Sequence, residues 1–65
     1  MKKLNAEERV LGAVKRSRDR GMTLNDLARV LDSNYATVQA ATARLRSRGQ
    51  LRFEQQGRTL RFWSA

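Results

Sequence analysis

Apolar residues in the first 48 positions recur at helical spacing in three separate runs. Residues three or four positions apart share one face of a helix, so each run predicts a helix with a single buried face. In chain order, the buried stripes are Val10, Leu11, Ala13 and Val14; Leu24, Leu27, Ala28 and Leu31; and Val38, Ala41 and Leu45. We therefore expect helices over residues 6–19, 24–31 and 35–48.

Residues that favour helix starts precede all three runs. Asn5 and Glu8 have the spacing of a capping box, in which each side chain accepts a hydrogen bond from the other residue's backbone N–H. Thr23 and Asp26 repeat this spacing before the second run, with aspartate in place of the preferred glutamate. Asn34 is expected to cap the third helix, because asparagine strongly favours the N-cap position.

After Gly49 the apolar positions alternate with polar ones, which is the period of a β-strand. The pattern predicts two strands, over residues 50–55 and 58–63, that form a hairpin. Gln56 and Gly57 would form its two-residue turn, in which both residues adopt a positive φ.

This turn fixes which residues of the hairpin face one another. Phe53 would lie opposite Leu60, and Leu51 opposite Phe62. All four side chains would share the face that packs on the helices. Replacing Phe53 with alanine should then cost about 3 to 5 kcal/mol and largely unfold so small a domain.

The opposite face of the same hairpin carries charge. The expected register places Arg52 opposite Arg61, a like-charge pair that lowers stability unless an anion lies over it. Trp63 shares this face, and we expect it to cover an edge of the core against the first helix, because an exposed tryptophan usually needs a partner.

The chain is strongly basic, with 14 Lys and Arg against 6 Asp and Glu, a net charge of +8. Residues 33–65 hold six arginines and a single acidic residue, Glu54. Arginine suits contacts with phosphate or guanine because its planar fork donates two parallel hydrogen bonds. Charge alone fits a polyanion partner and a solvated surface equally well.

The residue types present argue against an enzyme. The sequence contains no His or Cys, and its acidic residues form no obvious acid–base pair. We expect no metal, cofactor or small-molecule ligand, and no membrane segment is apparent.

One domain over residues 1–65, located in the cytoplasm, is expected. It should be a monomer that could pair on DNA, because no apolar stripe remains outside the shared core.

The order of two helices, a short turn, a third helix and a β-hairpin resembles the winged helix-turn-helix superfamily. Three segments carry the resemblance: Thr23–Leu31, similar to the scaffold helix; Asn34–Val38, similar to the start of the recognition helix; and Leu45–Leu51, similar to the exit into the wing. The expected fold class is therefore mainly α with a small β-hairpin, a three-helix winged helix-turn-helix of the small single-domain prokaryotic or phage type.

The resemblance implies a transcription regulator that binds double-stranded DNA and is associated with the nucleoid. The recognition helix, residues 35–48, would enter the major groove, and the wing, residues 50–63, would lie on the backbone or minor groove. The candidate DNA-binding residues are Asn34, Tyr35, Ala36, Thr37, Gln39, Ala40, Arg44, Arg52, Arg58 and Arg61.

Within this set, Gln39 is best suited to read a base, because an amide pairs with both N6 and N7 of adenine. Tyr35 and Thr37 could donate to phosphate at the helix N-terminus. Simpler interpretations remain open: the Tyr35 ring could pack across the turn, Gln39 could be an ordinary surface residue, and Arg46 and Arg48 could only complement the helix dipole.

Two other functions are compatible with this sequence. The same fold could dock on an acidic protein partner through its basic face. RNA binding is less well supported, because a row of exposed aromatic residues is missing. Salt separates DNA binding from an apolar protein interface, since only DNA binding should weaken steeply with ionic strength.

Overall fold

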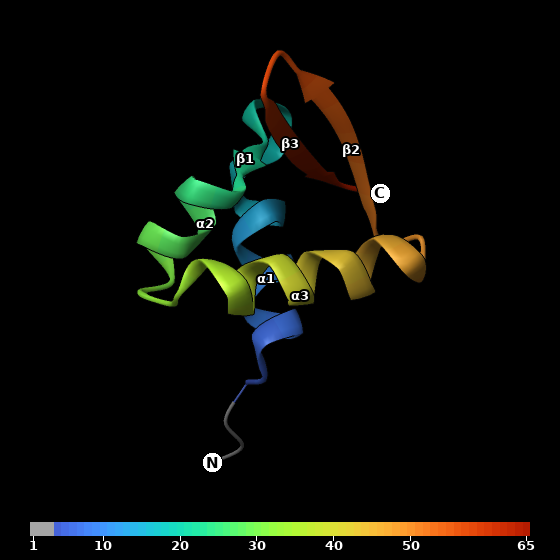
Figure 1. Ribbon diagram of the computed structural model, residues 1–65. Coiled ribbons are helices and arrows are strands. Elements are labelled where there is room, and N and C mark those ends of the chain that lie inside the picture. Colours follow the sequence, from blue (N-terminus) through green and yellow to red (C-terminus); the bar gives the residue numbers. More distant parts are fainter. Residues whose placement is uncertain (1–3) are drawn as a thin grey trace.

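A computed structural model describes residues 4–65 as three helices and a small antiparallel sheet (Figure 1). The elements are α1 (Ala6–Ser17), a 3₁₀ turn η1 (Arg18–Arg20), β1 (Met22–Thr23), α2 (Leu24–Val30), α3 (Tyr35–Ser47), β2 (Leu51–Gln56) and β3 (Thr59–Ser64). In Figure 1, α3 crosses in front of α1, α2 lies to one side, and the hairpin of β2 and β3 rises above the helices. No helix within residues 4–65 is long and apolar enough to cross a membrane.

The structure confirms the predicted starts of all three helices. Each start depends on contacts between residues that are close in sequence. Asn5 and Glu8 form a capping box, with bonds of 2.8 and 3.2 Å between side-chain oxygen and backbone nitrogen. Thr23 and Asp26 form the second, at 3.1 and 3.2 Å. The bond from the backbone N–H of Thr23 lowers the pKa of the Asp26 carboxyl group below its usual value.

The end of the first helix differs from its prediction. The α-helix stops at Ser17, two residues before the expected end, and the chain continues as η1. Arg18 adopts φ 52° and ψ −123°, a conformation that glycine favours and other residues adopt at a cost of about 1 to 3 kcal/mol. The sheet holds this turn in place, because Trp63 Nε1 donates to the carbonyl oxygen of Asp19 at 2.9 Å.

One hydrophobic core joins the three helices to the sheet. Its buried members are Val10, Ala13, Val14, Leu27, Val38, Ala41, Leu45, Leu51 and Phe62. Together with the half-buried Leu11, Leu24, Ala28 and Leu31, which pack against it, this core confirms the three predicted helical stripes. Thr42 is buried as well, and its hydroxyl group donates to the carbonyl oxygen of Gln39 at 2.9 Å.

The two predicted strands are present, but each lies one residue later than residues 50–55 and 58–63, and their register differs. The turn residues are Gly57 and Arg58, and Gln56 pairs with Thr59. Gly57 has φ 65°, whereas Gln56 does not have a positive φ, so the expected turn at Gln56–Gly57 is wrong. The turn moves by one residue because glycine then occupies its first position, as in type II′ hairpin turns.

The new register changes each cross-strand partner by two residues. Phe53 faces Phe62, and Leu51 faces Ser64. A shift of two keeps every side chain on its predicted face, since neighbours alternate with a period of two. The like-charge pair of Arg52 and Arg61 does not form.

The opposite face of the hairpin now carries a different set of pairs. Glu54 stands opposite Arg61, and Arg52 opposite Trp63. The half-buried Trp63 ring covers Gly21, where an added Cβ would lie 2.7 Å from it. Trp63 therefore covers an edge of the structure, as expected, but against the turn that follows α1.

Phe53 is not part of the core, so its predicted role is wrong. Half of its surface, 50%, is exposed, because β2 leaves the helices after Leu51. Its ring instead lies under the guanidinium group of Arg46, 3.8 Å from the Cζ atom to the ring centroid. Phe62, on the central strand, takes the core position and is 1% exposed.

A third strand, β1, was not predicted. It pairs with β3 and places Met22 opposite Phe62 and Thr23 opposite Arg61, so the strand order is β1-β3-β2. Two residues are too few to show an alternating pattern.

The contrast between the two phenylalanines gives a stability test. Phe62→Ala should destabilise the fold by about 3 to 5 kcal/mol, because it removes a fully buried ring. Phe53→Ala should cost only about 1 kcal/mol, mainly through loss of the stacked Arg46. Chemical denaturation of both variants checks this, and equal losses of stability would contradict the described packing.

Candidate nucleic-acid interface

The face of α3 opposite the core carries only small side chains. Ala36, Ala40, Ala43 and Ser47 follow one another at intervals of three or four residues and are all exposed. Short side chains allow the helix backbone to approach another surface closely, such as the floor of a groove. Ser47 was not among the predicted site residues, although it continues the spacing of the alanines.

The N-terminal turn of α3 offers hydrogen-bond donors. Asn34 is the N-cap, and its side-chain oxygen accepts the backbone N–H of Thr37 at 2.8 Å. The first intrahelical bond runs from the N–H of Val38, so the N–H groups of Tyr35 and Ala36 lie before the helical ladder. A helix N-terminus of this kind favours an anion.

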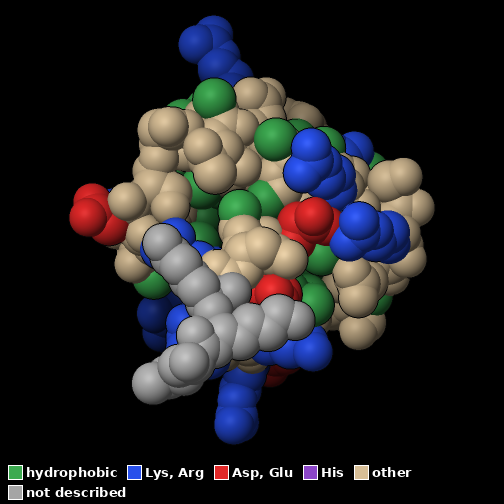
Figure 2. Space-filling view, turned by 90° about the horizontal axis from the view of Figure 1, so that it is seen from below, with side chains coloured by type: hydrophobic (Ala, Val, Ile, Leu, Met, Phe, Trp, Pro, Cys, Tyr) green, Lys and Arg blue, Asp and Glu red, His purple; other side chains and the backbone are tan. Residues whose placement is uncertain are grey.

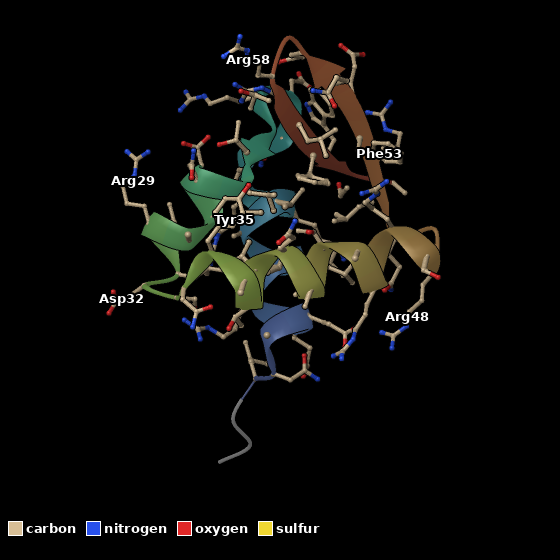
Figure 3. All side chains as sticks on the ribbon, viewed as in Figure 1. Arg29, Asp32, Tyr35, Arg48, Phe53 and Arg58 are labelled. Atoms are coloured by element: carbon tan, nitrogen blue, oxygen red, sulfur yellow. The ribbon has the colours of Figure 1, made fainter. Side chains whose placement is uncertain are left out.

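The polar side chains of α3 flank the small residues on both sides. Gln39 is exposed and lies one turn into the helix, with Ala36 and Ala40 nearby. Tyr35, 47% exposed, lies above α3 near α2 in Figure 3, so its ring is not buried across the turn. Thr37 is exposed on the other flank and lines a shallow groove with Asn5, Ala6, Glu7, Ala40, Ala41 and Arg44.

Arg44 of α3 and Arg48, the residue that follows α3, lie against one carboxylate of α1. Glu7 Oε2 lies 3.9 Å from Arg44 Nη1, and Glu7 Oε1 pairs with Arg48. The Glu7 side chain is only 18% exposed, whereas both guanidinium groups are largely exposed. Basic and acidic side chains lie side by side on the lower face of the molecule, seen in Figure 2. No local sequence pattern indicates this contact, because Glu7 is far from both arginines along the chain.

Arg46 connects α3 to the base of the hairpin. Its guanidinium group stacks on Phe53, and its Nε atom is buried without a hydrogen-bond partner. Arg46 is therefore more than the dipole partner that the sequence suggested.

The three predicted arginines of the wing differ in their exposure and in their hydrogen bonds within the protein. Arg52 on β2 and Arg58 at the hairpin tip are exposed, and Arg58 points away from the rest of the molecule (Figure 3). Arg61 is half-buried, and it donates to the side-chain oxygen of Gln56 at 3.1 Å and to the carbonyl oxygen of Arg20 at 3.2 Å. Arg61 thus has a structural role, whereas Arg52 and Arg58 are open to an external partner.

No cluster of three or more potential metal ligands occurs in the part of the chain that the structure describes. The groups available for binding are accordingly the helix N-terminus, the amide of Gln39 and the exposed guanidinium groups.

Comparison with known proteins identifies the fold. No family model matches the chain, and no curated protein has a significant sequence match. A solved structure, the S. aureus MepR–DNA complex, is similar over 95% of this chain with a TM-score of 0.85 and 20% sequence identity. The chain spans about half the length of the MepR chain, 52%. The similarity confirms the fold expected from the sequence: this chain has a three-helix winged helix-turn-helix fold.

Proposed function

We propose that this protein binds double-stranded DNA as a transcription regulator. In this proposal α3 enters the major groove, and the hairpin of β2 and β3 lies on the backbone or minor groove. The observation that carries it is the outward face of α3, where small side chains allow close approach and arginines line the flanks.

Several features support this interpretation. The net charge of +8 favours a polyanionic partner, and MepR, which has the same fold, is in complex with DNA in its solved structure. Gln39 has room to pair with an adenine edge, because its neighbours on the outward face, Ala36, Ala40 and Ala43, are small. Tyr35, Thr37 and the N-terminal N–H groups of α3 would contact phosphate. A nucleoid-associated location follows from the proposal.

Arg44 and Arg48 would contact the DNA backbone beside the groove. Glu7 now accepts a hydrogen bond from Arg48 and lies 3.9 Å from Arg44, near the positions that a phosphate would take. DNA binding would then exchange an internal carboxylate for an external phosphate, and Glu7 would set how strongly these arginines attract DNA.

A titration with duplex DNA at several salt concentrations tests the proposal. Binding to a mixed-sequence duplex should weaken steeply as salt rises, because phosphate contacts release condensed counterions. The protein-docking alternative predicts weak duplex binding and a partner whose affinity changes little with salt. Absence of duplex binding at low salt would contradict the proposed function.

Removing a base contact and removing a phosphate contact should change DNA binding in different ways. Gln39→Ala should weaken binding at the preferred site by about 1 to 3 kcal/mol and leave non-specific binding and its salt dependence unchanged. Arg58→Ala should weaken binding to all duplexes and reduce the slope of log affinity against log salt by about one unit. The preferred site would first be selected from a random duplex pool. If Gln39→Ala weakened every duplex equally, α3 would not read sequence.

Glu7 provides a further test of the proposed backbone contacts. Glu7→Gln should strengthen duplex binding about fivefold, because a unit charge a few ångström away in high dielectric contributes about 1 kcal/mol. Glu8→Gln is the matched control: it makes the same charge change one residue away, pairs with neither arginine, and keeps the capping box. Equal affinities of the two variants would show that Arg44 and Arg48 do not contact DNA.

A further inference from the structure

A cluster of positive charge without ion pairs among the described residues lies away from α3. Residues 15–20 contain four basic side chains and one acidic side chain, a local net charge of +3. Lys15, Arg16, Arg18 and Arg20 are all exposed. None of them forms an ion pair within residues 4–65, whereas Arg44 and Arg48 share Glu7.

These arginines surround an open cleft of about 740 Å³ between the end of α1, η1 and α2. Ala13, Met22 and Val30 contribute apolar lining, and Arg16, Arg18 and Arg20 contribute charge. Two carboxylates also line the cleft. Asp26 pairs with Arg29 at 3.3 Å, while Asp19 has no ion pair among the described residues.

The cleft is separate from the proposed interface. Its lining residues all come from positions 13–30, so none of them belongs to α3 or to the hairpin. Arg29, at one end of the cleft, points away from α3 in Figure 3. A ligand bound at this cleft would leave the outward face of α3 free.

The backbone at Arg18 gives a second reason to assign a function to this surface. Its positive φ of 52° suits glycine, so an arginine here lowers stability. Strained residues of this kind concentrate at functional sites. Hydrogen bonds from Trp63 and Arg61 to the carbonyl oxygens of η1 fix the turn, which reduces the ordering cost of binding.

We propose that Arg16, Arg18 and Arg20 bind the phosphate backbone of a second DNA duplex, so that one domain bridges two duplexes. The inference rests on the proposed binding of a first duplex by α3. Exposed arginines around an open cleft suit an extended polyanion, since each guanidinium group can meet a separate phosphate. Three such contacts would make capture of the second duplex fall about 40-fold between 50 and 200 mM salt.

A capture experiment tests this proposal. A short duplex is fixed to beads and loaded with a limiting amount of protein, and a fluorescent duplex of another sequence is then added. The wild-type protein should retain the fluorescent duplex. The variant with Arg16→Gln, Arg18→Gln and Arg20→Gln should retain about tenfold less of it, or lower still. The same variant should bind a single free duplex within about twofold of wild type. The corresponding triple lysine variant keeps the charge and should capture the second duplex.

Arg18→Gly separates function from folding. Glycine accepts the positive φ, so the melting temperature of this variant should rise while its capture of the second duplex falls. A loss of capture with increased stability cannot result from unfolding.

The outcomes distinguish this proposal from the one on which it rests. Unchanged capture by the triple glutamine variant overturns the second site and points to bridging by self-association. Equal weakening of single-duplex binding and of capture also overturns it, because the arginines would then belong to the first interface. If the wild type binds single duplexes but captures none, bridging fails and the proposed function stands. If it binds no duplex, the proposed function itself fails.

Discussion

The burial of Phe62 between the sheet and the helices is the contact on which this small domain depends. β3 is the central strand, so Phe62 lies between Met22 of β1 and Phe53 of β2 while its ring enters the core with residues of all three helices. The chain has no cysteine or histidine, and therefore no disulfide or His/Cys metal site strengthens the fold. Apolar packing at this one strand attaches the hairpin and η1 to the helices, and both proposed DNA surfaces depend on it.

The features that the sequence predicted correctly depend on residues close to one another along the chain. The capping boxes at Asn5 and Thr23, and the helical stripes, involve neighbours three or four residues apart. The predicted register of the hairpin was wrong, because registers that differ by two residues place the same side chains on the same face. The pattern could therefore identify the face of Phe53 but not its exposure, which depends on how far β2 extends beyond the helices.

The candidate site follows the same division. The small outward residues of α3 and the exposed Gln39 could be predicted from helical periodicity alone. Two contacts join elements that are distant in sequence, so no sequence pattern predicts them: the pairing of Glu7 with Arg44 and Arg48, and the stacking of Arg46 on Phe53. Arg61 is the clearest example, since it donates to the backbone carbonyl oxygens of Arg20 and Gly21, which only the tertiary fold brings near it.

The strand order also has a consequence for solubility. β2 is an outer strand, and its far edge presents backbone N–H and C=O groups that no strand within residues 4–65 covers. Such an edge is a template for aggregation through strand addition. Arg52 and Glu54 stand exposed along it, and a strand that joined this edge would have to strip water from both charges. The charged wing that is proposed to meet DNA therefore also protects the protein from β-sheet aggregation.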